Sequence, residues 1–283
     1  MSIELKDVCH TYSKGSTFAK NALNNINLTI ESGDFVGLIG HTGSGKSTLV
    51  QHLNALLKPH SGHIFIDGED INADKSRLKA IRSKVGLVFQ YPEHQLFDMT
   101  VYKDVSFGPK NAGLSGEEIK ERVESALTMV GIMPDMYEKS PFELSGGQKR
   151  RVAIAGVLAM RPEVLVLDEP AAGLDPRGRD EILNQVKKMH EGLQITVILV
   201  SHSMEDIARL VNRILVINKG EIVLSGTPTE IFAQIEQLEA IGLSTTQSAY
   251  IARDLRNKGF NLPENIFTVD VVVDAVLSEL QAR

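Results

Sequence analysis

Residues 40 to 47 carry the clearest chemical pattern in this sequence. They read Gly-His-Thr-Gly-Ser-Gly-Lys-Ser and match the phosphate-binding loop G-x-x-x-x-G-K-[ST]. Backbone amides in such a loop converge on phosphate oxygens at the positive end of the helix that follows. Lys46 supplies a point charge for β- and γ-phosphates, and Ser47 supplies a hydroxyl ligand for Mg²⁺. We therefore predict that a nucleotide is bound by Gly40, His41, Thr42, Gly43, Ser44, Gly45, Lys46, Ser47 and the adjoining Thr48.

A second pattern is a hydrophobic strand, residues 164 to 167, that ends in the adjacent carboxylates Asp168 and Glu169. Successive strand residues point to opposite sides, so we expect the two acids to have different tasks. Asp168 is placed to hold Mg²⁺, and Glu169 to accept a proton from an attacking water. His202 follows another buried strand at the same sheet edge, where it can hydrogen-bond a γ-phosphate.

Residues 144 to 148, Leu-Ser-Gly-Gly-Gln, open a predicted helix and are called here the signature segment. Ser145 and Gln148 have the spacing of a capping box. Gly146 and Gly147 each cost roughly 1 kcal/mol of helix propensity relative to alanine, which a cap alone does not require. Their bare amides offer a second phosphate-binding surface. Because one γ-phosphate is already held by residues 40 to 47, we expect this surface to serve a nucleotide bound to another subunit.

The elements that must position these residues indicate an α/β fold. Residues 35–39, 164–167 and 196–200 are continuous apolar runs, typical of strands buried in a parallel sheet with helical crossovers. Residues 3–8 and 23–30 alternate apolar and polar side chains, as half-exposed antiparallel strands do. We therefore predict a P-loop nucleotidase core sheet with an N-terminal antiparallel β-layer.

Two further regions have helical periodicity. Residues from about 92 to 161 form a predicted helical subdomain inserted between core strands. After Pro228, one apolar stripe runs from Ile231 to Ile241, and a valine-rich stripe from Val269 to Leu280 keeps helical spacing. The sequence thus predicts an ATPase-type domain over 1–228 and a C-terminal helical accessory or dimerisation domain over 229–283.

Composition limits the classes of function. The chain has 283 residues, 42% hydrophobic and 23% charged, with a net charge of −6, which argues against a nucleic-acid partner. We accordingly interpret the basic run Lys149-Arg150-Arg151 as a solvated helix face. The single Cys9 is expected of a reducing compartment. With neither a leader pattern nor roughly 18 consecutive apolar residues, we expect a cytosolic chain that does not cross a membrane by itself.

The order of these motifs over residues 1 to 228 resembles that of ABC-type ATPase subunits, with Gln90 and Asp175 completing the set. The resemblance implies ATP and Mg²⁺ as cofactors and a head-to-tail dimer in which each phosphate-binding loop faces the other chain's signature segment. It implies that Tyr12 stacks on adenine, that Gln90 reaches Mg²⁺ and the attacking water, and that Asp175 bridges protomers. The alternative for Tyr12 is that it is a strand aromatic whose ring fills the core. The signature residues expected on the opposite ATP are Ser145, Gly146, Gly147 and Gln148.

Residues 89–97, 152–160 and 169–176 are more specifically similar to the ATPases of energy-coupling factor vitamin transporters, and to the second of their two paralogues. This resemblance implies a heterodimer with a paralogous ATPase, a transmembrane coupling protein, and small substrate-binding membrane proteins. It places the chain at the cytoplasmic face of the cell membrane and implies vitamin uptake. Glu93 and Asp98 are expected to pair with arginines of the coupling protein. The alternative is a soluble ABC ATPase that acts on ribosomes or DNA, but one phosphate-binding loop and a short 90–144 interval disfavour it.

Overall fold

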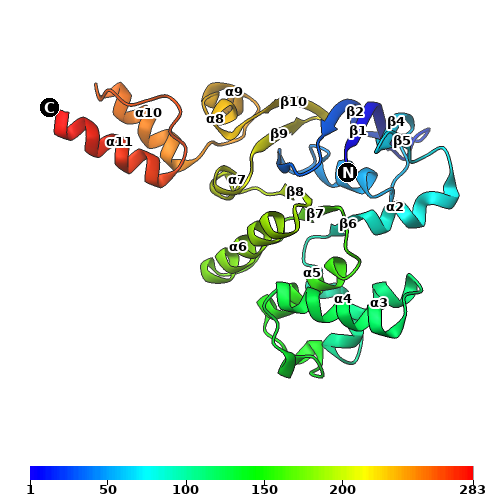
Figure 1. Ribbon diagram of the computed structural model, residues 1–283. Coiled ribbons are helices and arrows are strands. Elements are labelled where there is room, and N and C mark those ends of the chain that lie inside the picture. The colour runs from blue at the N-terminus through cyan, green and yellow to red at the C-terminus, as the bar shows by residue number, and fades with distance from the viewer. Residues whose placement is uncertain (283) are drawn as a thin grey trace.

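The computed structural model describes residues 1–282, and within them the strands form two sheets (Figure 1). The larger sheet has the order β10-β9-β3-β8-β7-β6, parallel except for the antiparallel pair of β9 and β10. Every residue of β3, β7 and β8 is buried, as their continuous apolar runs predicted. The strand bounds are β3 Phe35–Ile39, β6 Val85–Val88, β7 Val164–Asp168, β8 Thr196–Val200, β9 Arg213–Asn218 and β10 Glu221–Gly226. The expected α/β core is confirmed.

The N-terminal sheet is antiparallel, with the order β2-β1-β4-β5. In β2 the side chains alternate between buried and exposed from Ile26 to Ile30, as predicted. The buried side chains share one core with α1 (Lys46–Leu53) and with one face of the larger sheet, so α1 is held between the two sheets. The strand bounds are β1 Ile3–Tyr12, β2 Lys20–Ile30, β4 Ser61–Ile66 and β5 Glu69–Asp70.

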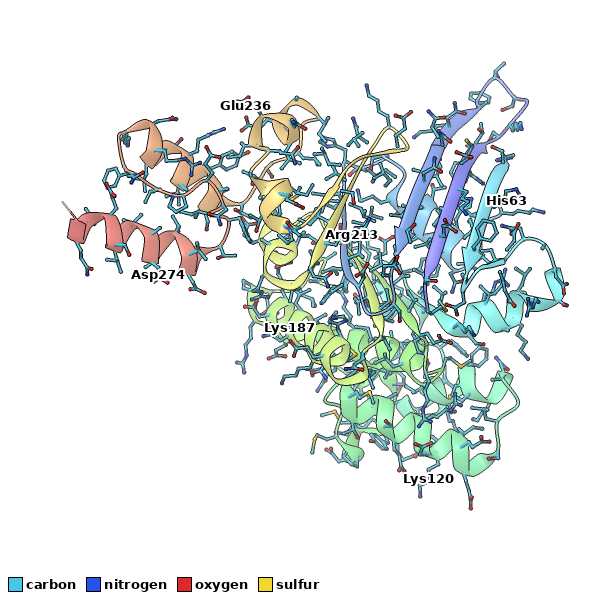
Figure 2. The ribbon with its side chains drawn as sticks, turned by 45° about the horizontal axis from the view of Figure 1, so that its top comes forward. His63, Lys120, Lys187, Arg213, Glu236 and Asp274 are labelled. Carbon is cyan, nitrogen blue, oxygen red and sulfur yellow. The ribbon has the colours of Figure 1, made fainter. Side chains whose placement is uncertain are left out.

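Helices fill the interval between β6 and β7 and lie together in the lower part of Figure 1. Their buried residues, including Val105, Val123 and Val152, join the core on the other face of the larger sheet. Charged side chains such as Lys120 on α4 and Lys187 on α6 point outward (Figure 2). The helices between β6 and β7 are η2 Pro92–Gln95, α3 Val101–Asn111, α4 Gly116–Met129, η3 Pro134–Met136, η4 Pro141–Glu143 and α5 Gly146–Leu158. Outside this interval, η1 Lys75–Arg77 and α2 Leu78–Lys84 precede β6, and α6 Pro176–Leu193 and α7 Met204–Leu210 follow β7.

The C-terminal region consists of α8 (Pro228–Phe232), α9 (Ile235–Ala240), α10 (Gln247–Asn257) and α11 (Val269–Ala282). The valine-rich stripe is a helix, as its spacing predicted. Side chains from Ile231 to Leu243 pack into the main core, whereas α10 and α11 share a small core of their own and extend away from the sheets (Figure 1). Within residues 1–282, no helix combines the length and the apolar character needed to span a bilayer.

Candidate nucleotide site

The loop of residues 40–47 connects the buried strand β3 to α1, as its motif requires. Gly45 has φ +114°, and a Cβ there would lie 2.5 Å from the carbonyl oxygen of Ala22 in β2. A Cβ at Gly40 would collide with the carbonyl oxygen of Ile217 in β9. Glycine is therefore needed because the loop packs tightly against neighbouring backbone, in addition to the approach of a phosphate.

Lys46 and Ser47 are oriented by contacts within the site. The Lys46 Nζ atom donates to the carbonyl oxygens of Gly40, at 2.5 Å, and His41, at 2.9 Å. Burial lowers the pKa of Lys46, and the charges of Glu169 and Asp168 partly oppose this effect. The Ser47 hydroxyl donates to an Asp168 carboxylate oxygen at 3.2 Å. A hydroxyl and a carboxylate at this separation are hard oxygen donors that fit Mg²⁺.

The two adjacent carboxylates face one cavity. β7 ends at Asp168, and Glu169 has φ +52°, so the alternation of a strand does not continue into Glu169. The expectation that the acids point to opposite sides is therefore wrong, although their environments differ. Burial raises the pKa of Asp168 despite the hydrogen bond from Ser47. Burial and then the charge of Asp168 raise the pKa of Glu169 to about 7.

His202, Gln90 and Tyr12 come to the same cavity from three other elements. The Nε2 atom of His202 lies 3.3 Å from Oε1 of Glu169. The Tyr12 hydroxyl is hydrogen-bonded to the hydroxyl of Thr48 at 3.2 Å, and Tyr12 as a whole is 41% exposed and lines the cavity. The cavity has a volume of 340 Å³ and is lined by Tyr12, Lys20, Ala22, Thr42, Gly43, Gly45, Lys46, Ser47, Thr48, Gln90, Asp168, Glu169 and His202. Sequence reasoning missed Lys20 and Ala22, which lie just before the strand predicted over residues 23–30.

Two histidine rings pack edge-to-face in a chain that begins at Tyr12. The ring centroid of His10 lies 4.8 Å from that of Tyr12 and 4.7 Å from that of His52. His52 is in α1, fully buried, with its Nδ1 atom 2.7 Å from the carbonyl oxygen of Thr48. Burial lowers the pKa of His52 to about 4 from an ordinary 6.5. The helix that carries the phosphate-binding loop therefore contains a histidine that is neutral near pH 7.

We predict that His52 makes the fold sensitive to acid. Between pH 6.5 and 4 the unfolded state binds the extra proton, so the stability from His52 is complete above 6.5 and is lost as the pH falls toward 4. At about pH 5 the loss is roughly 2 kcal/mol. Thermal melting at about pH 7.5 and pH 5 should show a drop roughly 4 to 8 °C larger in the wild type than in His52→Gln. The exposed His94→Gln is the control, and an equal drop in all three proteins would contradict the prediction.

The signature segment lies at the start of α5, away from this cavity. Ser145 and Gln148 form the predicted capping box, with N···O distances of 2.9 and 3.3 Å. A Cβ added at Gly146 or Gly147 would meet no atom within 4 Å, so the side-chain positions of both glycines face open space. Asp175 is the N-cap of α6. Within residues 1–282, the cavity lining contains neither the signature residues nor Asp175.

Two expectations about charged residues are wrong. Arg150 is 1% exposed rather than part of a solvated face, and it donates to both Glu93 carboxylate oxygens at 2.9 and 2.6 Å. Both carboxylate oxygens of Glu93 are therefore already paired with an arginine of this chain, contrary to the expectation that Glu93 pairs with arginines of another protein. Arg150 also donates to the carbonyl oxygens of Pro170, at 3.0 Å, and Ala172, at 2.7 Å. The spacing of Arg150, Ile154 and Leu158 by four residues placed it on the buried face and could have revealed this.

Comparison with known proteins gives consistent matches. The family model described as ABC transporter matches residues 23–172. The chain is 56% identical to the energy-coupling factor transporter ATP-binding protein EcfA2 of Clostridium tetani, over 95% of this chain and 94% of that protein. It is also 56% identical to the protein of the same name from Clostridium perfringens, over 98% of each.

Solved structures are similar as well. The structure of cbiO1 from Clostridium perfringens, described as part of the ABC transporter complex cbiONQ, superimposes with a TM-score of 0.76 at 39% identity, covering 90% of this chain and 98% of that one. The dimeric ATP-binding cassette MJ0796 in a post-hydrolysis state bound to ADP and Pi gives a TM-score of 0.71 at 34% identity, covering 80% and 98%.

Proposed function

This chain belongs to the family of ABC transporter ATP-binding proteins, as its motifs predicted, and we propose that it is the ATP-hydrolysing subunit of an energy-coupling factor importer. The relatives that carry this name are similar over nearly their whole length. The observation that carries the proposal is the single cavity where Lys46, Ser47, Asp168 and Glu169 meet. None of the matches favours the alternative of an ATPase that acts on ribosomes or DNA.

In the proposed mechanism, residues 40–48 bind the phosphates of ATP and Tyr12 stacks on the adenine. Mg²⁺ would be held by Ser47, Asp168 and Gln90, and when bound it neutralises charge on the phosphate oxygens. Glu169 accepts a proton from the water that attacks the γ-phosphorus. The bond to the ADP oxygen breaks as the new P–O bond forms, and His202 donates a hydrogen bond to the γ-phosphate.

The second half of each site comes from a paralogous partner in a head-to-tail dimer. The start of α5 supports this, because the side-chain positions of its two glycines face open space and its residues do not line the chain's own cavity. In this arrangement Ser145, Gly146, Gly147 and Gln148 contact the partner's ATP, and Asp175 bridges the two subunits. ATP then adds contacts that exist only in the closed dimer, so binding favours closure and hydrolysis removes that bias.

The division into an ATPase domain over 1–228 and an accessory domain over 229–283 is part of this proposal. The membrane partner is a transmembrane coupling protein that works with small substrate-binding membrane proteins, which places this chain at the cytoplasmic face of the membrane. The surface after Gln90 supports a docking site for it, because Phe97, Met99 and Phe107 are exposed by 59%, 77% and 48%. Uptake of a vitamin or similar micronutrient, the expectation from the family resemblance, is part of this proposal.

Asp98 lies in the same surface and is the carboxylate left to pair with an arginine of the coupling protein. Its Oδ1 atom accepts from the amide of Met99 at 2.7 Å, a contact that asparagine can keep. We expect Asp98→Asn to lower recovery of the membrane partner about 10-fold, as for loss of a charge-assisted hydrogen bond. Co-purification in mild detergent measures this. The exposed Asp135→Asn should retain full recovery, and equal recovery for both variants would refute the role of Asp98.

The proposed function is tested by purifying the chain from its native membranes in gentle detergent and identifying stoichiometric partners by mass spectrometry. Recovery of a paralogous ATPase, a coupling membrane protein and small, varied membrane proteins is the expected result. Two large permease subunits with an extracellular binding protein would retain the ATPase chemistry and overturn the type of transporter. Recovery of ribosomes or of a soluble dimer alone would overturn transport itself.

A further inference from the structure

The segment of residues 241–247, which joins α9 to α10, contacts the phosphate-binding loop at His41 and the first turn of α7 at Glu205. The first contact is made by the His41 side chain, whose Nε2 atom donates to the carbonyl oxygen of Ile241 at 2.6 Å. Gly242, with φ +70°, brings the backbone so close that a Cβ there would lie 2.9 Å from the same nitrogen. A residue in the middle of the phosphate-binding loop is thus held by the chain 200 positions further on.

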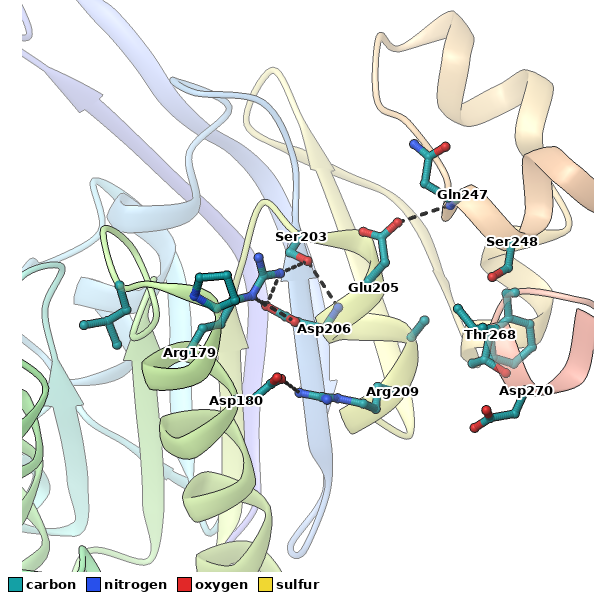
Figure 3. A pocket seen from close by; sticks show the side chains of 15 residues that line it. Arg179, Asp180, Ser203, Glu205, Asp206, Arg209, Gln247, Ser248, Thr268 and Asp270 are labelled. Carbon is teal, nitrogen blue, oxygen red and sulfur yellow. Dashed lines mark hydrogen bonds and ion pairs between the residues drawn. The ribbon is translucent and has the colours of Figure 1, made fainter. Parts of the chain in front are cut away.

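The second contact joins the segment to α7, the helix that begins just after His202. Glu205, in the first turn of α7 and three residues after His202, accepts a hydrogen bond from the amide of Gln247 at 3.1 Å (Figure 3). Glu205 and Gln247 also line a cavity of 980 Å³ between α6, α7 and the first turns of α10 and α11. The 241–247 segment itself is anchored between its two contacts, because Leu243, Thr245 and Thr246 are buried.

The contact with His41 reaches the catalytic lysine through one residue. The main-chain carbonyl of His41 accepts hydrogen bonds from Lys46 Nζ, at 2.9 Å, and from the amide of Ser44, at 3.1 Å. Fixing the His41 side chain therefore fixes the loop conformation that positions Lys46. Glu205 ties the same segment to the start of α7, which follows the His202 loop.

We propose that the 241–247 segment is a positioning element that sets the phosphate-binding loop relative to the His202 loop, so that the C-terminal region controls the chain's affinity for ATP. His41 and Glu205 are its positioning residues. The inference rests on the proposed function, since it concerns regulation of the same nucleotide site. It predicts that disturbing the segment changes nucleotide binding without touching the groups that contact Mg²⁺ or the attacking water.

Two glycines of the C-terminal region provide a matched test. Both Gly242→Ala and Gly259→Ala force alanine into a positive φ, at +70° and +88°. The new methyl group meets His41 only in Gly242→Ala, because a Cβ at Gly259 has no atom within 4 Å. Displacement of His41 breaks its bond to Ile241. We expect Gly242→Ala to weaken binding of trinitrophenyl-ATP to the full chain about 5-fold relative to Gly259→Ala, with similar melting temperatures.

A double-mutant cycle checks the route through His41. In a His41→Ala background, Gly242→Ala should cause little further loss, because its steric partner is gone. The exposed His41 and Glu205 also give variants that keep the fold, and Glu205→Ala, which removes the acceptor for the Gln247 amide, should raise KM for ATP while leaving the melting temperature within a few degrees. Additive effects in the cycle, or equal affinity for the two glycine variants, would overturn the proposal.

Lys46→Ala separates this inference from the function on which it rests. If Lys46→Ala abolishes binding of trinitrophenyl-ATP and Gly242→Ala binds like Gly259→Ala, the nucleotide site stands and the positioning role of the 241–247 segment is refuted. If Lys46→Ala binds the probe as the wild type does, the proposed nucleotide site is itself refuted.

Discussion

Replacing Glu169 by glutamine should lower the rate of ATP hydrolysis at least about 100-fold, the usual loss for a missing general base, while ATP binding is retained. Glutamine keeps the size and polarity of the side chain but cannot take a proton from water. The environment of Glu169 suits that task, because burial and the neighbouring Asp168 raise its pKa to about 7. Phosphate release by the assembled dimer measures turnover, and equilibrium binding of ATP measures the retained affinity.

The variant should also accumulate as an ATP-bound closed dimer, visible by size-exclusion chromatography in the presence of ATP and Mg²⁺. Glu163→Gln is the matched control, since Glu163 precedes the opposite end of the same strand, β7, and is 45% exposed at its side chain. Its turnover should equal that of the wild type. Unchanged turnover in Glu169→Gln would remove Glu169 from the role of general base.

The fold and the central residues of the site could be predicted where the signal is a pattern of residues that are close together in the sequence. Continuous apolar runs specified β3, β7 and β8, and the phosphate-binding loop is defined by eight consecutive residues. Asp168 and His202 could be placed because both follow buried parallel strands, whose carboxyl ends meet at one sheet edge. The helical spacing of Val269 to Leu280 correctly outweighed the strand propensity of valine.

The parts that could not be predicted depend on contacts between distant segments or on a local change of backbone. The turn at Glu169 overrides strand alternation through a positive φ, which no pattern of residue types announces. The bond from His41 to Ile241 links residues 200 positions apart. The net charge of the chain favours a solvated face for Arg150 and gives no sign of its carboxylate and carbonyl partners, which lie on two other segments.

Arg150 connects three functional segments through buried hydrogen bonds. It follows the signature segment in α5, its guanidinium binds Glu93 three residues after Gln90, and it also binds the carbonyls of Pro170 and Ala172. Burial opposes ionisation of Glu93, but the hydrogen bonds and charge of Arg150 outweigh it and lower the pKa of Glu93. The pair therefore remains charged near neutral pH, with both carboxylate oxygens and the two backbone carbonyls satisfied.

Arg150→Met should consequently destabilise the protein by about 4 kcal/mol, because it leaves the Glu93 charge buried without a partner. The midpoint of thermal unfolding should fall by roughly 8 to 16 °C. Adding Glu93→Gln should recover part of this loss, since the orphaned charge is then absent, and the two effects should not add. Arg177→Met, at an 88% exposed side chain paired with Glu181, should shift the midpoint by less than a few degrees. A small shift in Arg150→Met, or strict additivity with Glu93→Gln, would mean that the three segments are held together by apolar packing and not by this ion pair.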